Sequence, residues 1–132
     1  MPFFRHSDLS LHYMDEGSGE PVMLIHGLGC SGTEWGLQIP LLRARGFRVI
    51  VPDLPGSGAS APTRGNYSIP HFAEILWRLI DDLAIPHVNL VGFSMGGAIA
   101  LQMAIDRPEI VPRLALINSL CGPQERDQAA WA

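Results

Sequence analysis

The sequence predicts an α/β fold, in which a mostly parallel β-sheet carries helices on both of its faces. Two observations predict this fold. Short apolar runs alternate along the 132 residues with segments of helical pattern, and several of the runs are apolar at every position. A strand that is apolar throughout is buried on both faces, as in a parallel sheet between two layers of helices. Alternating strands and helices form such a sheet through right-handed crossovers.

The first half of the chain is expected to supply four strands and one helix. Alternation of apolar and polar residues in two short segments favours an antiparallel pair at a sheet edge, and two continuously apolar runs follow. Thr33 is a suitable N-cap for a helix that runs to Arg45, where Gly46 ends it. The strands expected here are residues 3–6, 9–14, 21–25 and 47–52.

The second half of the chain is expected to add two helices and two strands. Ser68 is the expected N-cap of a helix with an apolar stripe, and Pro86 follows its end. The stripe consists of Ile69, Phe72, Leu76, Leu79, Ile80 and Leu83. Strands are expected over residues 88–91 and 114–117, on either side of a helix over residues 98–105. The last strand would leave an open, apolar sheet edge, which favours self-association.

The composition excludes several classes of protein. Hydrophobic residues make up 47% of the sequence and charged residues 17%, as in an ordinary globular domain. The formal net charge is −4 and the basic residues form no cluster, so we expect no nucleic-acid partner. No apolar run is long enough to span a membrane and the N-terminus lacks a signal-peptide layout; we expect a cytoplasmic chain without a membrane partner. Cys30 and Cys121 lack metal-ligand spacing, so we expect free thiols, no metal site and no cofactor.

The most informative motif is Gly92-Phe93-Ser94-Met95-Gly96-Gly97, between an apolar strand and a helix. A G-x-S-x-G in this position is typical of a nucleophile elbow, a turn so sharp that the serine hydroxyl projects into solvent at the end of the sheet. A side chain two residues before or after the serine would collide with strand or helix, which explains Gly92 and Gly96. Ser94 is therefore the candidate nucleophile, and the following helix directs free N–H groups at an attacked carbonyl oxygen.

Two further motifs follow buried strands. His26-Gly27-Leu28-Gly29 comes after the first buried strand, and Asp53-Leu54-Pro55-Gly56-Ser57-Gly58-Ala59-Ser60 comes after the second. With the elbow, these motifs make the chain resemble the α/β-hydrolase fold superfamily, in the branch of small cytoplasmic esterases, lactonases and carbon–carbon bond hydrolases. The resemblance covers the chain up to about Ser119.

This resemblance implies a role for each matching residue. Ser94 is the nucleophile, and the backbone N–H groups of Leu28 and Met95 are the two donors of an oxyanion hole. Because the nucleophile is a serine rather than a carboxylate, we expect hydrolysis of a small acyl substrate through an acyl-serine intermediate. Trp35, with Leu28 and Met95, would give the substrate an apolar wall. The other motif residues are expected to shape the loops: His26, Gly27, Gly29, Asp53, Gly56, Gly58, Ser60, Gly92, Gly96 and Gly97.

The remainder of a catalytic triad has no candidate in this sequence. In the superfamily an acid and a histidine follow the nucleophilic serine along the chain. All five histidines precede Ser94, and Asp106 and Glu109 lie at the far end of the elbow helix. We therefore expect residues 1–132 to be the N-terminal part of a single α/β-hydrolase domain, inactive by itself, in which residues 120–132 begin a cap region.

Two other functions stay open on the residues alone. A non-catalytic binding or assembly module of hydrolase fold would explain why the acid and the histidine are missing. A dinucleotide-binding domain would explain Gly27-Leu28-Gly29-Cys30-Ser31-Gly32, a G-x-G-x-x-G after a buried strand, with Asp53 placed for a ribose. The dinucleotide hypothesis leaves the elbow of residues 92–97 unexplained.

Overall fold

One sheet organises the computed structural model, which describes residues 3–63 and 67–119. Its strands lie in the order β1-β2-β4-β3-β5-β6; β3 to β6 run parallel, whereas β1 and β2 are antiparallel to their neighbours. The strands are β1 (Phe3–His6), β2 (Leu9–Glu16), β3 (Glu20–Ile25), β4 (Phe47–Pro52), β5 (Asn89–Phe93) and β6 (Leu114–Ile117). The expected cap segment 120–132, which includes Cys121, lies outside the described residues.

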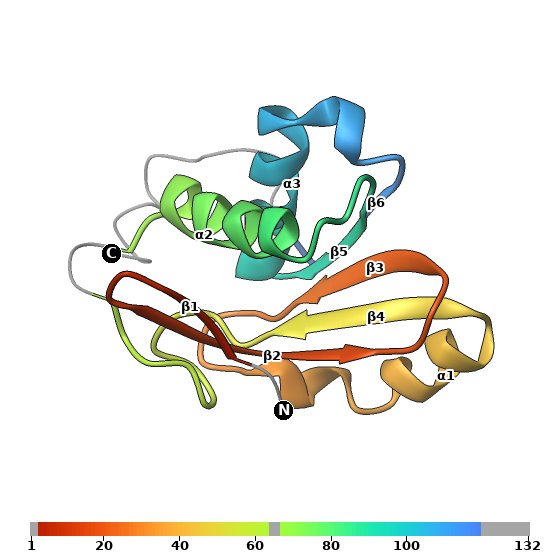
Figure 1. The fold of residues 1–132 in the computed structure, drawn as a ribbon, viewed down its shortest axis with the longest axis horizontal. Helices are drawn as coiled ribbons and strands as arrows, with labels where there is room; N and C mark the ends of the chain where they lie inside the picture. The colour runs from red at the N-terminus through yellow and green to blue at the C-terminus, as the bar shows by residue number, and fades with distance from the viewer. Residues whose placement is uncertain (1–2, 64–66, 120–132) are drawn as a thin grey trace.

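Helices cover both faces of the sheet, as predicted (Figure 1). They are the short 3-10 helix η1 (Gly32–Trp35), α1 (Gln38–Ala44), α2 (Ile69–Asp82), α3 (Met95–Asp106) and η2 (Pro108–Ile110). Alternate residues of β3 face the two layers: Met23 and Ile25 pack in the cluster with α2 and α3, and Val22 and Leu24 pack in the cluster with η1 and α1. The central strands are therefore buried on both sides.

Most expected elements are confirmed to within a few residues. β4 and β6 have the predicted bounds, and β1 and β2 form the predicted antiparallel pair at one edge. Ser68 caps α2, since its hydroxyl accepts the His71 N–H at 3.2 Å. The predicted stripe of α2 packs against the core, with Phe72, Leu76, Leu79 and Ile80 buried and Ile69 and Leu83 partly buried.

The continuous helix expected from Thr33 to Arg45 is wrong. Ser31 is the N-cap of η1, since its hydroxyl accepts the Thr33 N–H at 3.4 Å. η1 ends at Trp35, and α1 begins at Gln38. Pro40 explains the break, because it has no N–H for the carbonyl four residues earlier and its ring would clash with that carbonyl.

The parallel strands bring the sequence motifs to one edge of the sheet. Strand β3 lies between β4 and β5, with Met23 opposite Ile50 and Ile25 opposite Gly92. The carboxyl ends of parallel strands meet at the same edge, where open α/β sheets bind their ligands. The segments after β3, β4 and β5 therefore lie next to one another.

Candidate active site

Ser94, the candidate nucleophile, is the single residue between β5 and α3. Its backbone has φ 54° and ψ −118°, a conformation that costs a non-glycine residue about 1–3 kcal/mol. Main-chain bonds hold the turn: the Ser94 N–H donates to the Ile117 carbonyl at 3.0 Å, and the Gly97 N–H donates to the Ser94 carbonyl at 3.0 Å. The half-buried serine thus lies at the strand-to-helix turn that a nucleophile elbow requires.

Gly92 and Gly96 allow the strand and the helix to approach each other closely at this turn. A Cβ on Gly92 would lie 2.5 Å from the Gly97 Cα, and a Cβ on Gly96 would overlap the carbonyl oxygens of Ile25 and His26. These are main-chain atoms, which cannot move aside as a flexible side chain can. Helix α3 begins at Met95, directly after the serine, and so three residues earlier than the helix expected from Ala98.

The loop after β3 lies against the elbow. Because Ile25 pairs with Gly92, the chain after β3 passes beside the residues that follow β5. A Cβ on Gly27 would lie 3.2 Å from the Phe93 Cδ1 and 3.4 Å from the Ser94 Cβ. The structure therefore brings the His-Gly motif and the candidate nucleophile together.

Residues 27–30, called the oxyanion loop below after the role expected for them from the sequence, form a tight turn. The Cys30 N–H donates to the Gly27 carbonyl at 3.2 Å, and Gly29 has φ 75°. Glycine fills the third position of such a turn because it adopts a positive φ without steric cost. Leu28 belongs to this turn, and Met95 is the first residue of α3, where N–H groups have no partner within the helix. The two expected oxyanion donors thus come from segments that meet at Ser94.

His26 is completely buried and joins two loops. Its Nε2 accepts the Leu54 N–H at 3.0 Å, which places the ring proton on Nδ1, 2.7 Å from the Gly27 carbonyl oxygen. Both ring nitrogens are therefore used in holding the loops after β3 and β4. An imidazole bound in this way has no free nitrogen to act as a general base for Ser94.

The Asp53 carboxylate ties together three segments of the chain. It accepts the N–H groups of Gly32 at 2.7 Å and Ala59 at 3.0 Å, and the His12 Nδ1 lies 2.9 Å from it. The Ser60 hydroxyl donates to the Asp53 carbonyl at 2.6 Å and accepts the His12 N–H at 2.8 Å. These bonds connect β2 with the segments after β3 and β4, and the partners Gly32 and His12 were not identified from the sequence.

Two glycines shape the loop after β4 around this carboxylate. Gly56 has φ 80° and Gly58 has φ 52°, both in the region that favours glycine. A Cβ on Gly58 would overlap the Asp53 carboxylate, and one on Gly56 would lie 3.2 Å from the Tyr67 hydroxyl. The loop can therefore close over Asp53 only with small residues at these positions.

Replacing Asp53 with asparagine should destabilise the protein by about 2–3 kcal/mol near neutral pH, because the amide would direct N–H donors at buried N–H groups. Burial alone would raise the pKa of the Asp53 carboxyl, but hydrogen bonds from Ala59, Gly32 and His12 outweigh it and lower the pKa below 3.8. The ionised carboxylate therefore stabilises the fold above pH 3.8, and this contribution is lost as the pH falls through the lower folded-state value.

Urea unfolding of the Asp53→Asn variant and the wild type checks this prediction. The difference in unfolding free energy should be largest near neutral pH and should shrink as the pH falls below 3.8. Asp8→Asn is the matched control, since Asp8 is exposed in the turn between β1 and β2. A difference that does not change with pH would contradict the role of the Asp53 charge.

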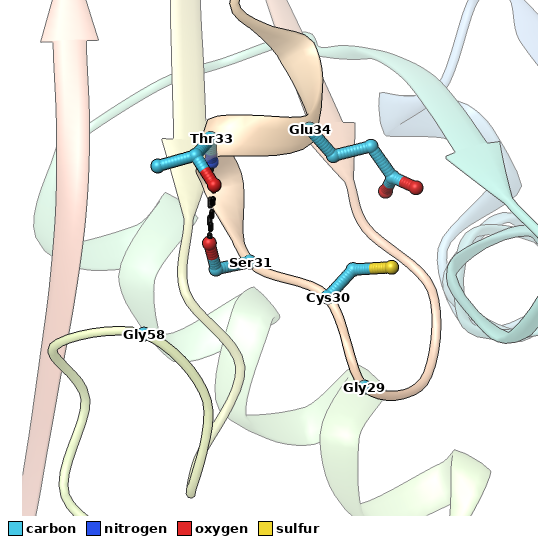
Figure 2. Close-up of a pocket in the computed structure, with 6 residues that line it drawn as sticks. All are labelled: Gly29, Cys30, Ser31, Thr33, Glu34 and Gly58. Carbon is cyan, nitrogen blue, oxygen red and sulfur yellow. Dashed lines mark hydrogen bonds between the residues drawn. The ribbon is translucent and has the colours of Figure 1, made fainter.

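An open hollow of about 490 Å³ lies beside the oxyanion loop (Figure 2). Its wall is formed by Gly29, Cys30, Ser31, Thr33, Glu34 and Gly58. Figure 2 shows the Cys30 and Glu34 side chains pointing to the same side of the loop, whereas the hydroxyls of Ser31 and Thr33 meet at 2.8 Å. Partial burial raises the pKa of the Cys30 thiol, and the neighbouring Glu34 carboxylate raises it further through a hydrogen bond and its charge. The wall is polar, and Ser94 does not line it.

The expectation that Trp35 lies on an apolar wall of the substrate site is wrong. Its side chain is only 4% exposed and packs between the sheet and α1, with Val49, Val51 and Ile39. Leu28, by contrast, is 62% exposed at the tip of the oxyanion loop. Of the expected apolar residues, Leu28 is therefore the one open to solvent.

The sequence and the fold of this chain are similar to those of known proteins. A family model for the alpha/beta hydrolase fold matches residues 20–131. The chain belongs to the alpha/beta hydrolase fold family. The magnesium-chelatase 30 kDa subunit of Rhodobacter capsulatus is 48% identical over 102 residues, which are 76% of this chain and 35% of that protein. The (E)-2-((N-methylformamido)methylene)succinate hydrolase of Acinetobacter baylyi is 35% identical over 119 residues, 90% of this chain and 44% of that protein.

A solved carboxylesterase structure from the thaumarchaeon Nitrososphaera gargenis matches with a TM-score of 0.90 at 31% identity, over 96% of this chain and 48% of that chain. This alpha/beta hydrolase chain thus spans less than half the length of all three proteins.

Over residues 3–63 and 67–119, no helix combines the length and the apolarity needed to cross a membrane. Within the same ranges, no three His, Cys, Asp or Glu side chains are grouped as a metal site.

The local structure after β3 counts against the dinucleotide hypothesis. A Rossmann-type site binds pyrophosphate at the N-terminus of an α-helix that directly follows the glycine-rich turn. In this alpha/beta hydrolase chain the glycine-rich residues 27–32 lead into η1, a 3-10 helix of four residues. The N-terminus of α1 comes only after Leu37, beyond that short helix.

Proposed function

We propose that the protein is a serine hydrolase that cleaves an ester, a lactone or a related acyl or carbon–carbon bond of a small substrate. The observation that carries this proposal is the strained backbone of Ser94 between β5 and α3, against the oxyanion loop. The names of two similar proteins support it, since one is a hydrolase and one a carboxylesterase.

In the proposed reaction the Ser94 hydroxyl attacks the substrate carbonyl and gives its proton to a general base. The N–H groups of Met95 and Leu28 stabilise the negative charge that develops on the carbonyl oxygen, and loss of one such donor costs about 10²–10³-fold in turnover. When the resulting intermediate collapses, the bond between the carbonyl carbon and the leaving group breaks, and the leaving group departs with the proton that the general base had accepted. Water then hydrolyses the acyl-serine, which releases the acyl product and restores the Ser94 hydroxyl. Family members carry the acid and the histidine after the serine along the chain. We propose that both groups come from a part of the domain beyond residues 1–132.

Covalent labelling with a fluorophosphonate probe tests this proposal in the full-length protein purified from its own cells. The probe reacts with serines whose hydroxyl a general base activates, so its adduct should lie on the peptide that contains Ser94. Peptide mass spectrometry locates the adduct. A folded protein that is labelled at another serine, or at none, would contradict the proposal.

A second candidate function is a non-catalytic assembly or binding module. It is favoured by the relative of 48% identity, which is named as a subunit of a magnesium chelatase. A module of this kind needs the fold and its surface but not an activated hydroxyl. The absence of any Ser94 adduct on the folded, full-length protein would favour this candidate over the serine hydrolase.

We further propose that the 132-residue chain associates with itself through β6. Among the described strands β6 pairs only with β5, and its Ile117 is 42% exposed. An unpaired strand edge offers N–H and C=O groups to a second copy, and a lysine on such an edge opposes pairing. In size-exclusion chromatography with light scattering, Ile117→Lys should shift the chain toward monomer. Leu37→Lys is the control, at an exposed position before α1, and should leave the oligomeric state unchanged. A wild-type chain that is monomeric at every concentration would contradict the proposal.

A further inference from the structure

We infer that Glu34 is a positioning residue, which holds the oxyanion loop in the orientation that the reaction needs. The inference rests on the proposed function. Glu34 lies in η1, and its Oε2 accepts the N–H of the buried Gly27 at 3.2 Å. This bond ties the first residue of the loop to the helix that follows it. Within the described ranges Glu34 forms no ion pair, and its carboxylate also takes a hydrogen bond from the thiol of Cys30, the last residue of the same loop.

The bond matters because Gly27 determines where the Leu28 N–H points. The Gly27 carbonyl and the Leu28 N–H belong to one planar peptide group and point in opposite directions. That carbonyl lies 3.2 Å from the Cys30 nitrogen and 2.7 Å from the His26 Nδ1. The Leu28 N–H is therefore directed away from the turn. Glu34 fixes the other peptide group of Gly27, so rotation of this residue is restrained on both sides.

The position of Gly27 also sets the distance between the loop and the nucleophile. A Cβ on Gly27 would lie 3.4 Å from the Ser94 Cβ, which leaves little free space between the two segments. Without an acceptor, the buried Gly27 N–H would be left unpaired at a cost in free energy, and the loop would move to bring it to water or to another acceptor. A shift of about 1 Å at a reacting group can cost about 10²-fold in rate. Loss of the acceptor oxygen at position 34 should therefore slow the chemical step more than it weakens binding.

The test compares Glu34→Ala with Glu34→Gln in the full-length protein. Glutamine retains an oxygen that accepts the Gly27 N–H, whereas alanine does not. With a fluorophosphonate probe, Glu34→Ala should lower the maximal rate of Ser94 labelling by about 10–100-fold, with little change in the half-saturating probe concentration. Glu34→Gln should stay within about threefold of the wild type. Glu74→Ala, an exposed position on α2, is the matched control and should react like the wild type.

Hydrogen exchange of the peptide that contains Gly27 gives a readout that needs no activity. Its protection should fall in Glu34→Ala and persist in Glu34→Gln. Equal labelling rates in Glu34→Ala and the wild type, or a Glu34→Gln variant as slow as Glu34→Ala, would overturn the inference. If the wild type itself is not labelled at Ser94, the proposed function fails. Unchanged protection of Gly27 in Glu34→Ala would then overturn the positioning role separately.

Discussion

Replacing Ser94 with alanine in the full-length protein should abolish fluorophosphonate labelling and lower kcat/KM for hydrolysis by about 10⁴–10⁶-fold. Alanine removes the attacking oxygen, and binding together with the oxyanion hole leaves only a small residual rate over water. The variant should fold like the wild type, because alanine meets the same backbone strain as serine at φ 54°. Labelling kinetics and ester turnover, measured beside thermal unfolding, check both expectations.

Two further substitutions make this result specific to the elbow. Ser18→Ala makes the same chemical change at an exposed position in the turn between β2 and β3, and should leave labelling unchanged. Ser94→Gly should be as inactive as Ser94→Ala but about 1 kcal/mol more stable, because glycine relieves the backbone strain. Labelling that persists in Ser94→Ala would show that the nucleophile lies elsewhere.

Replacing Gly96 with alanine should destabilise the chain by more than about 4 kcal/mol, a large part of the total stability of an ordinary domain. The added Cβ would overlap the carbonyl oxygens of Ile25 and His26, where β3 leads into the oxyanion loop. Relief of this overlap would require α3 to move away from the sheet, and α3 carries buried residues such as Ile99 and Met103. We therefore expect loss of both the fold and the elbow.

Urea and thermal unfolding, followed by circular dichroism, measure this effect. Gly36→Ala is the matched control, because Gly36 has helical φ −56° and a Cβ there would meet only the Thr33 carbonyl oxygen at 3.4 Å. That variant should be neutral or slightly stabilised, since alanine reduces the freedom of the unfolded chain. Equal stability of Gly96→Ala and Gly36→Ala would contradict the proposed close approach of α3 and β3.

Features that depend on neighbouring residues could be predicted from the sequence. The continuous apolar runs indicated β3 and β4, and the apolar spacing with Ser68 indicated α2 and its first residue. The turn at Ser94 was predicted because Gly92, Ser94 and Gly96 stand within five residues, between an apolar strand and a helix. The close contact that requires glycine at position 96 is with Ile25 and His26, which are distant in the sequence. The break before α1 also had a local signal in Pro40, which the prediction of one long helix overlooked.

Features that depend on strand order could not be predicted in the same way. His12 lies on the more polar side of β2, which by itself indicates a side chain facing solvent. Its contact with Asp53 arises because β2 pairs with β4, and no pattern within either segment shows that the two strands are neighbours. Glu34 is similar, because its bond to Gly27 requires the chain to turn back through residues 27–30.

The sequence by itself determined the strands, the start of α2 and the position of the candidate nucleophile, because hydrophobic period, caps and backbone sterics act over a few residues. Only the tertiary structure decided which groups hold the loops around Ser94 in place. The β3–β5 register sets Gly27 against Ser94, the β2–β4 pairing brings His12 to Asp53, and the turn of the oxyanion loop brings Glu34 to Gly27. Hydrogen bonds between segments that are distant in the sequence depend on how the strands are arranged in the sheet, so local sequence patterns do not indicate them.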